Sequence, residues 1–335
     1  MPSPIDLPLR AALHGLARRR FARLGASVAL LIALVAVCAD LLASDLPLAA
    51  RFEDRLYLLP NVTRPAPLRP YNNQTLEAAL GAHDWVIFPL VPWGHNSHDL
   101  SSVLAAPSGD HWLGTDSSGR DVFARIVHGA RVSLTVALIS VWLMSCIGLV
   151  VGLCAGYFGG LIDTVLMRGV DALHALPTTL LIIVVLQIAR PSGFSAVIAM
   201  TLVIGCVRWT DLSRLVRAEV LRVRVTPFVE AARALGMPPA RVIRRHVLPN
   251  VLSPVLVAAS FSMAGAILME GALSFLGFGV PDDVATWGGL LNDVRVHIDA
   301  WWLAVFPGAV LFLTVGACNL LGEIVREAID PKQRL

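Results

Sequence analysis

The chain has 335 residues, of which 56% are hydrophobic and only 15% are charged, and its formal net charge is +3. This composition argues against a soluble globular protein and is typical of a chain embedded in a membrane. No nucleic-acid partner is expected for it.

Six apolar runs predict membrane-spanning helices, each of which needs about 20 mostly apolar residues. The runs are residues 24–39, 132–154, 172–189, 193–207, 251–269 and 300–322. The first and fourth are short, and flanking residues such as Leu41, Leu42 and Trp209 would lengthen them. The first also resembles a signal-peptide core because arginines precede it, but we favour a retained span. The sequence therefore predicts an all-α polytopic membrane protein with about six transmembrane helices.

The arginines predict the orientation of these helices, because the only lysine is Lys332. Residues 208–249 contain nine arginines against three acidic residues, whereas residues 45–128 contain six arginines against nine acidic residues. Cationic loops stay in the cytoplasm, so the former segment and both termini are expected there. The predicted order is a cytoplasmic segment 1–23, a first helix 24–43, a periplasmic segment 44–129, a five-helix core 130–322 with a cytoplasmic loop 208–250, and a cytoplasmic tail 323–335.

The outer segment 44–129 has no long helical or strand periodicity, and prolines interrupt it repeatedly. We expect irregular structure with short elements. Four of its histidines could suggest a metal site, namely His83, His95, His98 and His111. No cysteine or paired carboxylate completes a ligand set, so no metal site is predicted.

Three glycines in the second apolar run predict close helix packing. Gly148, Gly152 and Gly156 repeat every four residues and so lie on one helix face, where a neighbouring helix can approach. Shortly after them, the charged residues Asp163, Arg168 and Asp171 are expected to form a structural salt bridge rather than a transport relay.

The loop 208–250 is predicted to contain a helix, a glycine break and a second helix. Thr226 is expected to cap the first helix and Pro227 to occupy its first turn. Gly236 gives this helix a left-handed end, and the prolines at 238–239 start a second helix that ends before Pro249.

The second helix of this loop is predicted to be amphipathic. One face is apolar (Ala240, Ile243, Val247) and another is basic (Arg241, Arg244, Arg245). From these residues alone, the element is either an interfacial helix on anionic lipid or a docking surface for a soluble partner.

Two motifs resemble those of known transport proteins. Glu230-Ala231-Ala232, Gly236 and Leu248-Pro249 resemble the EAA signature of binding-protein-dependent ABC importer permeases. Residues 114–121 and 129–134 are similar to the segment before the second span of dipeptide and oligopeptide permeases. The motif residues of that outer segment are Gly114, Thr115, Asp116, Gly119, Arg120 and Asp121.

The resemblance covers about residues 114–332, with two departures. His246 stands where the signature commonly has isoleucine, and Pro281-Asp282-Asp283 replaces the usual consecutive prolines. A long outer segment also resembles the oligopeptide branch that includes microcin C importers.

The resemblance implies a type I ABC importer permease fold in the bacterial inner membrane, and a peptide substrate. A nickel complex or another small solute is the alternative. It further implies that the loop docks into a cleft of an ATPase through Glu230, Ala231, Ala232, Gly236, Arg241, Arg245, His246, Leu248 and Pro249. The implied partners are a second homologous permease, two ABC ATPase subunits, a periplasmic solute-binding protein and the lipid bilayer. No cofactor is expected on this chain, because ATP and Mg²⁺ would bind the partner ATPase.

The residues give less support to three other functions, namely ATP binding by this chain, intramembrane hydrolysis and ion-coupled transport. A phosphate-binding Walker loop needs a lysine followed by serine or threonine, whereas Lys332 precedes Gln333. No motif of an intramembrane hydrolase is present, so the chain is not expected to be an enzyme. An ion-coupled secondary transporter usually has two related halves, and no repeat is evident here.

Overall fold

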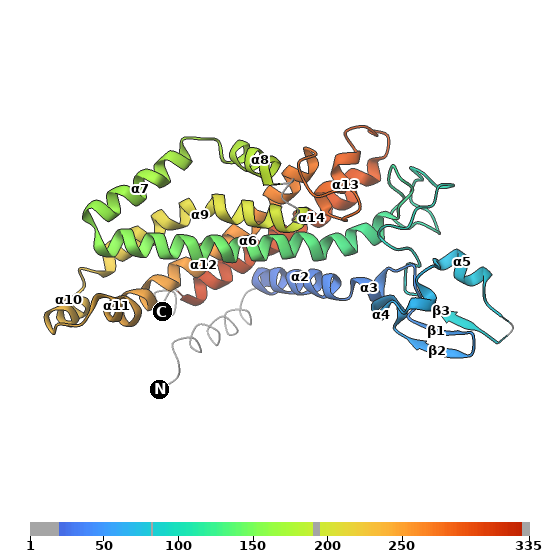
Figure 1. Cartoon of the computed structure of the whole chain (residues 1–335), viewed down its shortest axis with the longest axis horizontal. Coiled ribbons are helices and arrows are strands. Elements are labelled where there is room, and N and C mark those ends of the chain that lie inside the picture. Colours follow the sequence, from blue (N-terminus) through green and yellow to red (C-terminus); the bar gives the residue numbers. More distant parts are fainter. Residues whose placement is uncertain (1–19, 82, 190–194, 330–335) are drawn as a thin grey trace. The chain divides into compact units, whose positions relative to one another are not determined.

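The computed structural model describes residues 20–81, 83–189 and 195–329, and the chain is mostly helical (Figure 1). The longer helices are α2 (Arg20–Val37), α6 (Val122–Phe158), α7 (Gly160–His174), α8 (Thr178–Ala189), α9 (Ala196–Val223), α12 (Leu248–Phe275) and α14 (Trp301–Ile329). The shorter elements are α3 (Ala39–Leu42), α4 (Pro60–Thr63), η1 (Ala66–Leu68), α5 (Asn73–Ala78), α10 (Pro227–Ala234), α11 (Pro239–Val242), η3 (Ile243–Val247), α13 (Trp287–Asp293) and the strands β1 (Ala49–Phe52), β2 (Arg55–Leu58) and β3 (Trp85–Ile87). The predicted all-α polytopic class is confirmed.

Within the described residues, four helices are long and apolar enough to cross a membrane. They are α6, α9, the continuous helix Pro239–Phe275, and α14. The pair α7 and α8 would make a fifth span, but it is bent by 90° at a break that contains Pro177. The predicted first span corresponds to a shorter apolar helix, Arg23–Val37. α2 ends at Val37, and α3 begins at Ala39 after Cys38.

The fourth predicted span and the start of the predicted loop need correction. The helix does not end near residue 207 but continues as α9 to Val223. Its charged second half is compatible with a helix because α7 supplies partners. Arg217 forms a bidentate ion pair with Asp163, and Arg214 lies 2.6 Å from Asp171. The loop therefore begins after Val223. The predicted structural salt bridge is confirmed for Asp163 and Asp171, whereas Arg168 forms no ion pair with the residues that the structure describes.

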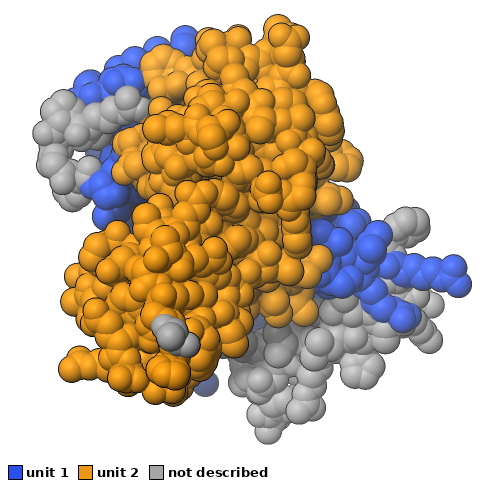
Figure 2. Space-filling view, turned by 90° about the vertical axis from the view of Figure 1, so that its right-hand side faces the viewer, with its two compact units in different colours: residues 1–28, 136–269, 315–335 blue, residues 29–135, 270–314 orange. Residues whose placement is uncertain are grey.

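The chain forms two compact units, which Figure 2 shows in different colours. The first unit comprises residues 1–28, 136–269 and 315–335, and the second comprises residues 29–135 and 270–314. The boundaries fall within α2, α6, α12 and α14.

Close packing of α6 against α9 organises the first unit. A Cβ atom added to Gly152 would lie 2.6 Å from the carbonyl oxygen of Ser213 and 2.5 Å from the Cβ of Val216. Gly148 and Gly156 are similarly crowded by α9. The predicted packing role of the three glycines is confirmed, because no side chain fits between the two backbones.

Replacing Gly152 by alanine should therefore separate α6 from α9. Overpacking of this kind costs about 1–3 kcal/mol, and we expect a lower midpoint of thermal unfolding for the purified protein in detergent. The matched control is Gly169→Ala, because a Cβ there would meet no atom within 4 Å. Equal unfolding midpoints for the two variants would contradict the packing account.

The outer segment forms part of the second unit and contains the expected short elements. Its three strands pair antiparallel in the order β2-β1-β3. The sheet packs on a small apolar core that includes Leu46, Phe52, Leu68 and Leu76. Asn72 caps α5 with a reciprocal capping box to Thr75. The small sheet was not predicted, since strands of three or four residues leave no readable alternation.

Candidate functional site

The site built around the EAA-like residues begins with α10, which follows α9 after a short turn (Figure 1). Pro227 occupies the first turn of α10, as predicted, because its missing N–H would have no partner there. Thr226 precedes it at the cap position, but its hydroxyl donates to the carbonyl oxygen of Val223 (2.6 Å) and does not cap α10. The predicted side-chain cap is therefore wrong, because the hydroxyl is used to close the preceding helix end.

Gly236 ends α10 in the left-handed conformation that the sequence predicts. Its φ is +73°, a region that residues with a Cβ rarely adopt. The amide of Met237 then donates to the carbonyl of Ala232 (3.2 Å), and that of Gly236 to Arg233 (3.0 Å). These bonds close the helix end in a Schellman-like turn.

The second helix does not end before Pro249, which corrects the sequence prediction. α11, η3 and α12 form one continuous helix from Pro239 to Phe275, with a π-helical turn at Ile243–Val247. Pro249 cannot donate to the carbonyl of Arg245, and its ring would clash with that carbonyl in a regular α-helix. The wider turn, in which the amide of Leu248 donates to Ile243, gives the ring room, so the helix continues.

The buried face of this helix–turn–helix packs on the long helices. Val229 and Ala232 of α10, with Val242 and Val247 of the second helix, join a core formed by α9 and α12. The predicted apolar stripe is wrong in one place, since Ala240 is exposed. The π turn shifts the register, so that Val242 takes the buried position.

The residues predicted to dock the ATPase lie mostly on the surface of this element. Glu230, Ala231, Gly236, Arg241, Arg245 and Pro249 are exposed, His246 and Leu248 are half-buried, and Ala232 is buried. The structure thus brings the predicted residues into one element, with Ala232 facing inward as a packing residue.

Two apolar residues of this surface were missed by the sequence analysis. Phe228 is 46% exposed and Leu235 is 83% exposed, at the two ends of α10. The ring of Phe228 lies 6.3 Å from that of His246. Large exposed apolar side chains at helix ends are available for a partner. The signal in the sequence was their spacing of seven residues, which places both on one face of α10.

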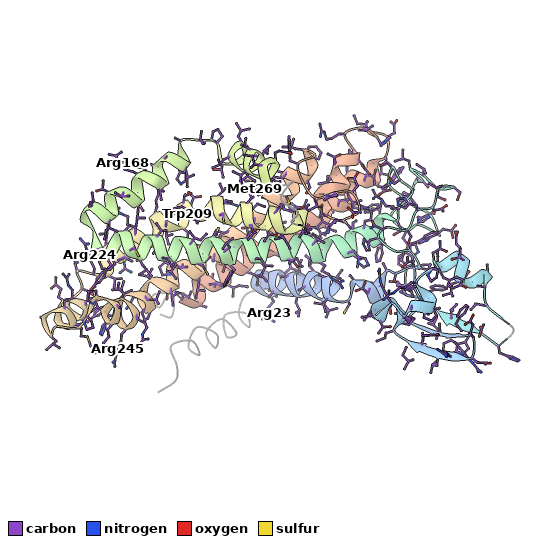
Figure 3. The ribbon with its side chains drawn as sticks, in the orientation of Figure 1. Arg23, Arg168, Trp209, Arg224, Arg245 and Met269 are labelled. Atoms are coloured by element: carbon purple, nitrogen blue, oxygen red, sulfur yellow. The ribbon has the colours of Figure 1, made fainter. Side chains whose placement is uncertain are left out.

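Arginines surround the exposed apolar residues. Arg233, Arg241, Arg244 and Arg245 are exposed, and Glu230 is the one exposed acid of α10. Figure 3 labels Arg245 in this element. The element therefore offers a short helix with a small side chain, Ala231, at its centre and a basic border.

The outer motif, in the second unit, forms a buried ion-pair network. Asp116 is fully buried, and its Oδ2 lies 2.7 Å from Nε of Arg120 and 3.5 Å from Nε of Arg125. Its Oδ1 accepts from the amides of Ser118 and Arg120 at 2.9 Å. Both arginines donate to the backbone carbonyl of Asp282. The network ties the loop after α12 to the start of α6.

The remaining motif residues shape this loop. Asp121 caps α6 through the amide of Ala124 (2.8 Å), and Thr115 accepts from the amide of Ala105 (2.8 Å). Gly114 and Gly119 have φ of +79° and +74°, and a Cβ on Gly119 would lie 2.2 Å from the carbonyl oxygen of Asp99. The motif is therefore a structural one.

His111 joins the network as a buried histidine. Its Nδ1 lies 2.8 Å from Asp121, and its Nε2 lies 3.5 Å from Asp99. The hydrogen bond to Asp121 raises the pKa of His111 above its usual value, although burial opposes this. His95 behaves in the opposite way, because burial and the neighbouring His128 lower its pKa to about 4. No group of His, Cys, Asp or Glu in the described ranges could hold a metal ion.

The stability of the outer loop should therefore fall as the pH rises above neutrality. The folded-state pKa of His111 exceeds the unfolded value of about 6.5. Protonated His111 therefore stabilises the folded loop fully below pH ~6.5, and this stabilisation is lost as the pH rises through the raised pKa. The pKa of His95 is lowered to about 4, so its protonation affects the stability of the loop only below pH ~6.5. Hydrogen exchange at the first turn of α6 should accelerate beyond the intrinsic pH effect, and His111→Gln should remove that excess. Protection that increases over this range would contradict the assignment.

Glu270 is a further residue that the sequence analysis missed. It is buried in α12, and it accepts hydrogen bonds from Ser133 (2.8 Å) and Ser274 (2.9 Å). Nearby, α13 packs so closely on α12 that a Cβ on Gly288 would lie 2.5 Å from the carbonyl oxygen of Gly271. The available signal was an acid directly after an apolar run that ends at residue 269.

The chain also matches a known protein family and several known proteins. Residues 148–335 match the family described as binding-protein-dependent transport system inner membrane component. A putative peptide permease protein of Brucella suis is 40% identical over 252 residues, which cover 74% of this chain and 82% of that protein. A dipeptide transport system permease protein of Alkalihalophilus pseudofirmus is 42% identical over 235 residues, covering 70% and 76%. The corresponding protein of Bacillus subtilis is 38% identical over 237 residues, covering 70% and 73%.

Two solved structures are also similar. An amino acid ABC transporter with histidines matches with a TM-score of 0.48 and 16% identity, over 61% of this chain and 94% of that chain. The methionine ABC transporter MetNI in an inward-facing conformation matches with a TM-score of 0.47 and 20% identity, over 61% and 97%.

Proposed function

Because the chain belongs to the family of binding-protein-dependent transport system inner membrane components, we propose that it is the permease subunit of an ATP-driven importer for peptides. The relatives named as peptide and dipeptide permeases support the substrate class, since they align with 70% or more of this chain. The observation on which the proposed coupling rests is the exposed helix–turn–helix α10–α11, held between α9 and α12.

The geometry of this element suits mechanical coupling to an ATPase. The buried side of α10 is fixed to the two long helices, while Ala231 keeps its exposed side narrow. A short helix anchored at both ends can pass on a rigid-body motion, which a flexible loop could not. Closure of an ATPase around α10 would thus shift α9 and α12 together and open the pathway on alternate sides.

The charges of this surface favour a protein over a lipid partner. An anionic membrane would attract the four exposed arginines of the element, but it would repel Glu230. A protein cleft can offer acidic groups to the arginines, a hydrogen-bond donor to Glu230, and apolar walls to Phe228 and Leu235. ATP and Mg²⁺ would bind the ATPase, so this chain supplies movement and a pathway.

The proposed assembly contains two ATPase subunits, a second homologous permease and a periplasmic solute-binding protein. Both termini of this permease would lie in the cytoplasm, with residues 44–121 on the outer side. This orientation is supported by the excess of arginine in residues 208–249 and by the excess of acids in residues 45–128.

Uptake by proteoliposomes that contain the assembled transporter tests the proposal. We expect labelled di- and oligopeptides to accumulate only with ATP on the ATPase side, and to stop accumulating when ATP is removed while the ion gradient is kept. Uptake that survives ATP removal would instead indicate an ion-coupled transporter. ATP-driven uptake of a nickel complex or another small solute, without uptake of peptides, would refute the substrate class alone.

A further inference from the structure

Arg208 is a charged residue in the middle of α9, a helix long and apolar enough to span a membrane. Twelve residues separate it from Ala196 at one end and fifteen separate it from Val223 at the other. At 1.5 Å per residue, these separations are about 18 Å and about 22 Å. The twelve residues of α9 before Arg208 carry no charge, whereas five further charged residues follow it, so Arg208 lies where the apolar half of this helix ends. An ionisable side chain within a span faces the bundle interior, water or the membrane interface.

The other charged residues of α9 have partners, whereas Arg208 has none in the part of the chain that the structure describes. His174 lies 3.3 Å from Asp211, and Arg214 and Arg217 pair with the acids of α7. Arg222 pairs with Glu219 on the same helix. Among residues 20–81, 83–189 and 195–329, no carboxylate or hydrogen-bond acceptor contacts the guanidinium of Arg208. Since α7 ends at His174, the ladder of ion pairs stops one helical turn before this arginine.

The guanidinium of Arg208 lies against α12. Its position falls on the same face of α9 as the buried residues Ile204 and Leu212. A Cβ atom added to Gly265 of α12 would lie 3.0 Å from Nη1 and 3.1 Å from Nη2. A glycine therefore makes the room in which the guanidinium sits. Figure 3 labels Trp209, the next residue of α9, and Met269, which lies one turn after Gly265 on α12.

This placement has the features of a transient anion site. Arginine stays charged in any environment, and its planar fork matches a carboxylate with two parallel hydrogen bonds. Arg208 is half-buried, so the side chain is not sealed within the packed core. A permanent internal acid would hold the guanidinium in one pair, whereas a vacant arginine can accept an anion and release it.

We propose that Arg208, supported by the bare backbone at Gly265, binds the carboxylate of the transported solute during its passage. This inference rests on the proposed function and deepens it, because a peptide with a free C-terminus brings a carboxylate of the required kind. The subsite would select for a free carboxylate on the solute during its passage.

The experiment compares two forms of one tripeptide, the free acid and the C-terminal amide, in proteoliposomes with the complete transporter. The ratio of their initial uptake rates is measured after confirming that the binding protein holds both. We expect Arg208→Gln to lower the acid-to-amide ratio about tenfold, as for loss of one charge-assisted contact. Arg208→Lys should retain part of the ratio, and Gly265→Ala should lower it by displacing the guanidinium. Arg222→Gln on the same helix is the charge-matched control and should leave the ratio unchanged.

The possible outcomes distinguish failure of this inference from failure of the proposed function. An unchanged ratio in Arg208→Gln, with normal peptide uptake, would refute this inference alone. Equal loss of both peptides together with loss of the second permease from the purified complex would show that Arg208 pairs with that subunit, which also refutes it. If the wild type carries only the free acid, a tenfold slower uptake of that acid by an intact Arg208→Gln complex supports the proposal. A wild-type complex that imports neither peptide would refute both the proposed function and the subsite.

Discussion

Replacing Asp116 by alanine is expected to lower the free energy of unfolding by about 3–5 kcal/mol, the usual effect of removing one partner from a buried ion pair. Asp116 is fully buried, and its carboxylate is the nearest counter-charge for both Arg120 and Arg125. Without it, two buried guanidinium groups would repel each other, and two loop amides would lose their acceptor. The purified variant should unfold at a markedly lower temperature, or fail to accumulate in the membrane.

The matched control for this prediction is Asp282→Ala. Asp282 serves both arginines through its backbone carbonyl, which alanine also provides. We therefore expect this variant to unfold close to the wild-type temperature. A large loss of stability in Asp282→Ala, or none in Asp116→Ala, would show that the side chains are used differently.

Replacing Gly236 by valine is expected to uncouple the permease from its ATPase without removing the protein from the membrane. With φ at +73°, a β-branched side chain strains the backbone by more than the 1–2 kcal/mol typical of the left-handed region. The strain is relieved by unwinding the end of α10, which moves Leu235 and the basic border. We expect strongly reduced co-purification of the ATPase and loss of ATP-driven uptake.

Gly236→Asn separates strain from crowding in this prediction. Asparagine tolerates the left-handed conformation better than other residues, and a Cβ at this position would meet no atom within 4 Å. It should therefore retain most of the ATPase binding that valine abolishes. Equal binding by the wild type and the valine variant would be incompatible with a conformational role for Gly236.

Local rules predicted the elements that depend on single residues. Pro227 and Gly236 fix the beginning and end of α10, and the spacing of Gly148, Gly152 and Gly156 fixes a packing face. Each of these residues acts through its own backbone or its missing side chain. Such effects can be read without knowledge of the rest of the fold.

Features that depend on distant partners could not be predicted. The extension of α9 to Val223 relies on the acids of α7, and a count of arginines does not show which of them are paired. The helix continues past Pro249 because a π turn accommodates its ring while Val242 and Val247 keep their packing. The small sheet depends on a core assembled from four separate segments. In each case tertiary contacts override the local signal.

The most direct test of the central claim is a photo-cross-linking amino acid placed at Ala231, in the middle of the exposed side of α10. In membranes that import peptide, we expect a cross-link from this position to the ATPase subunit. The control position is Val296, which is 77% exposed in the loop after α13 and should give no such product. A cross-link to lipid alone from Ala231, in vesicles with active uptake, would contradict the assignment of this helix as the ATPase-docking element.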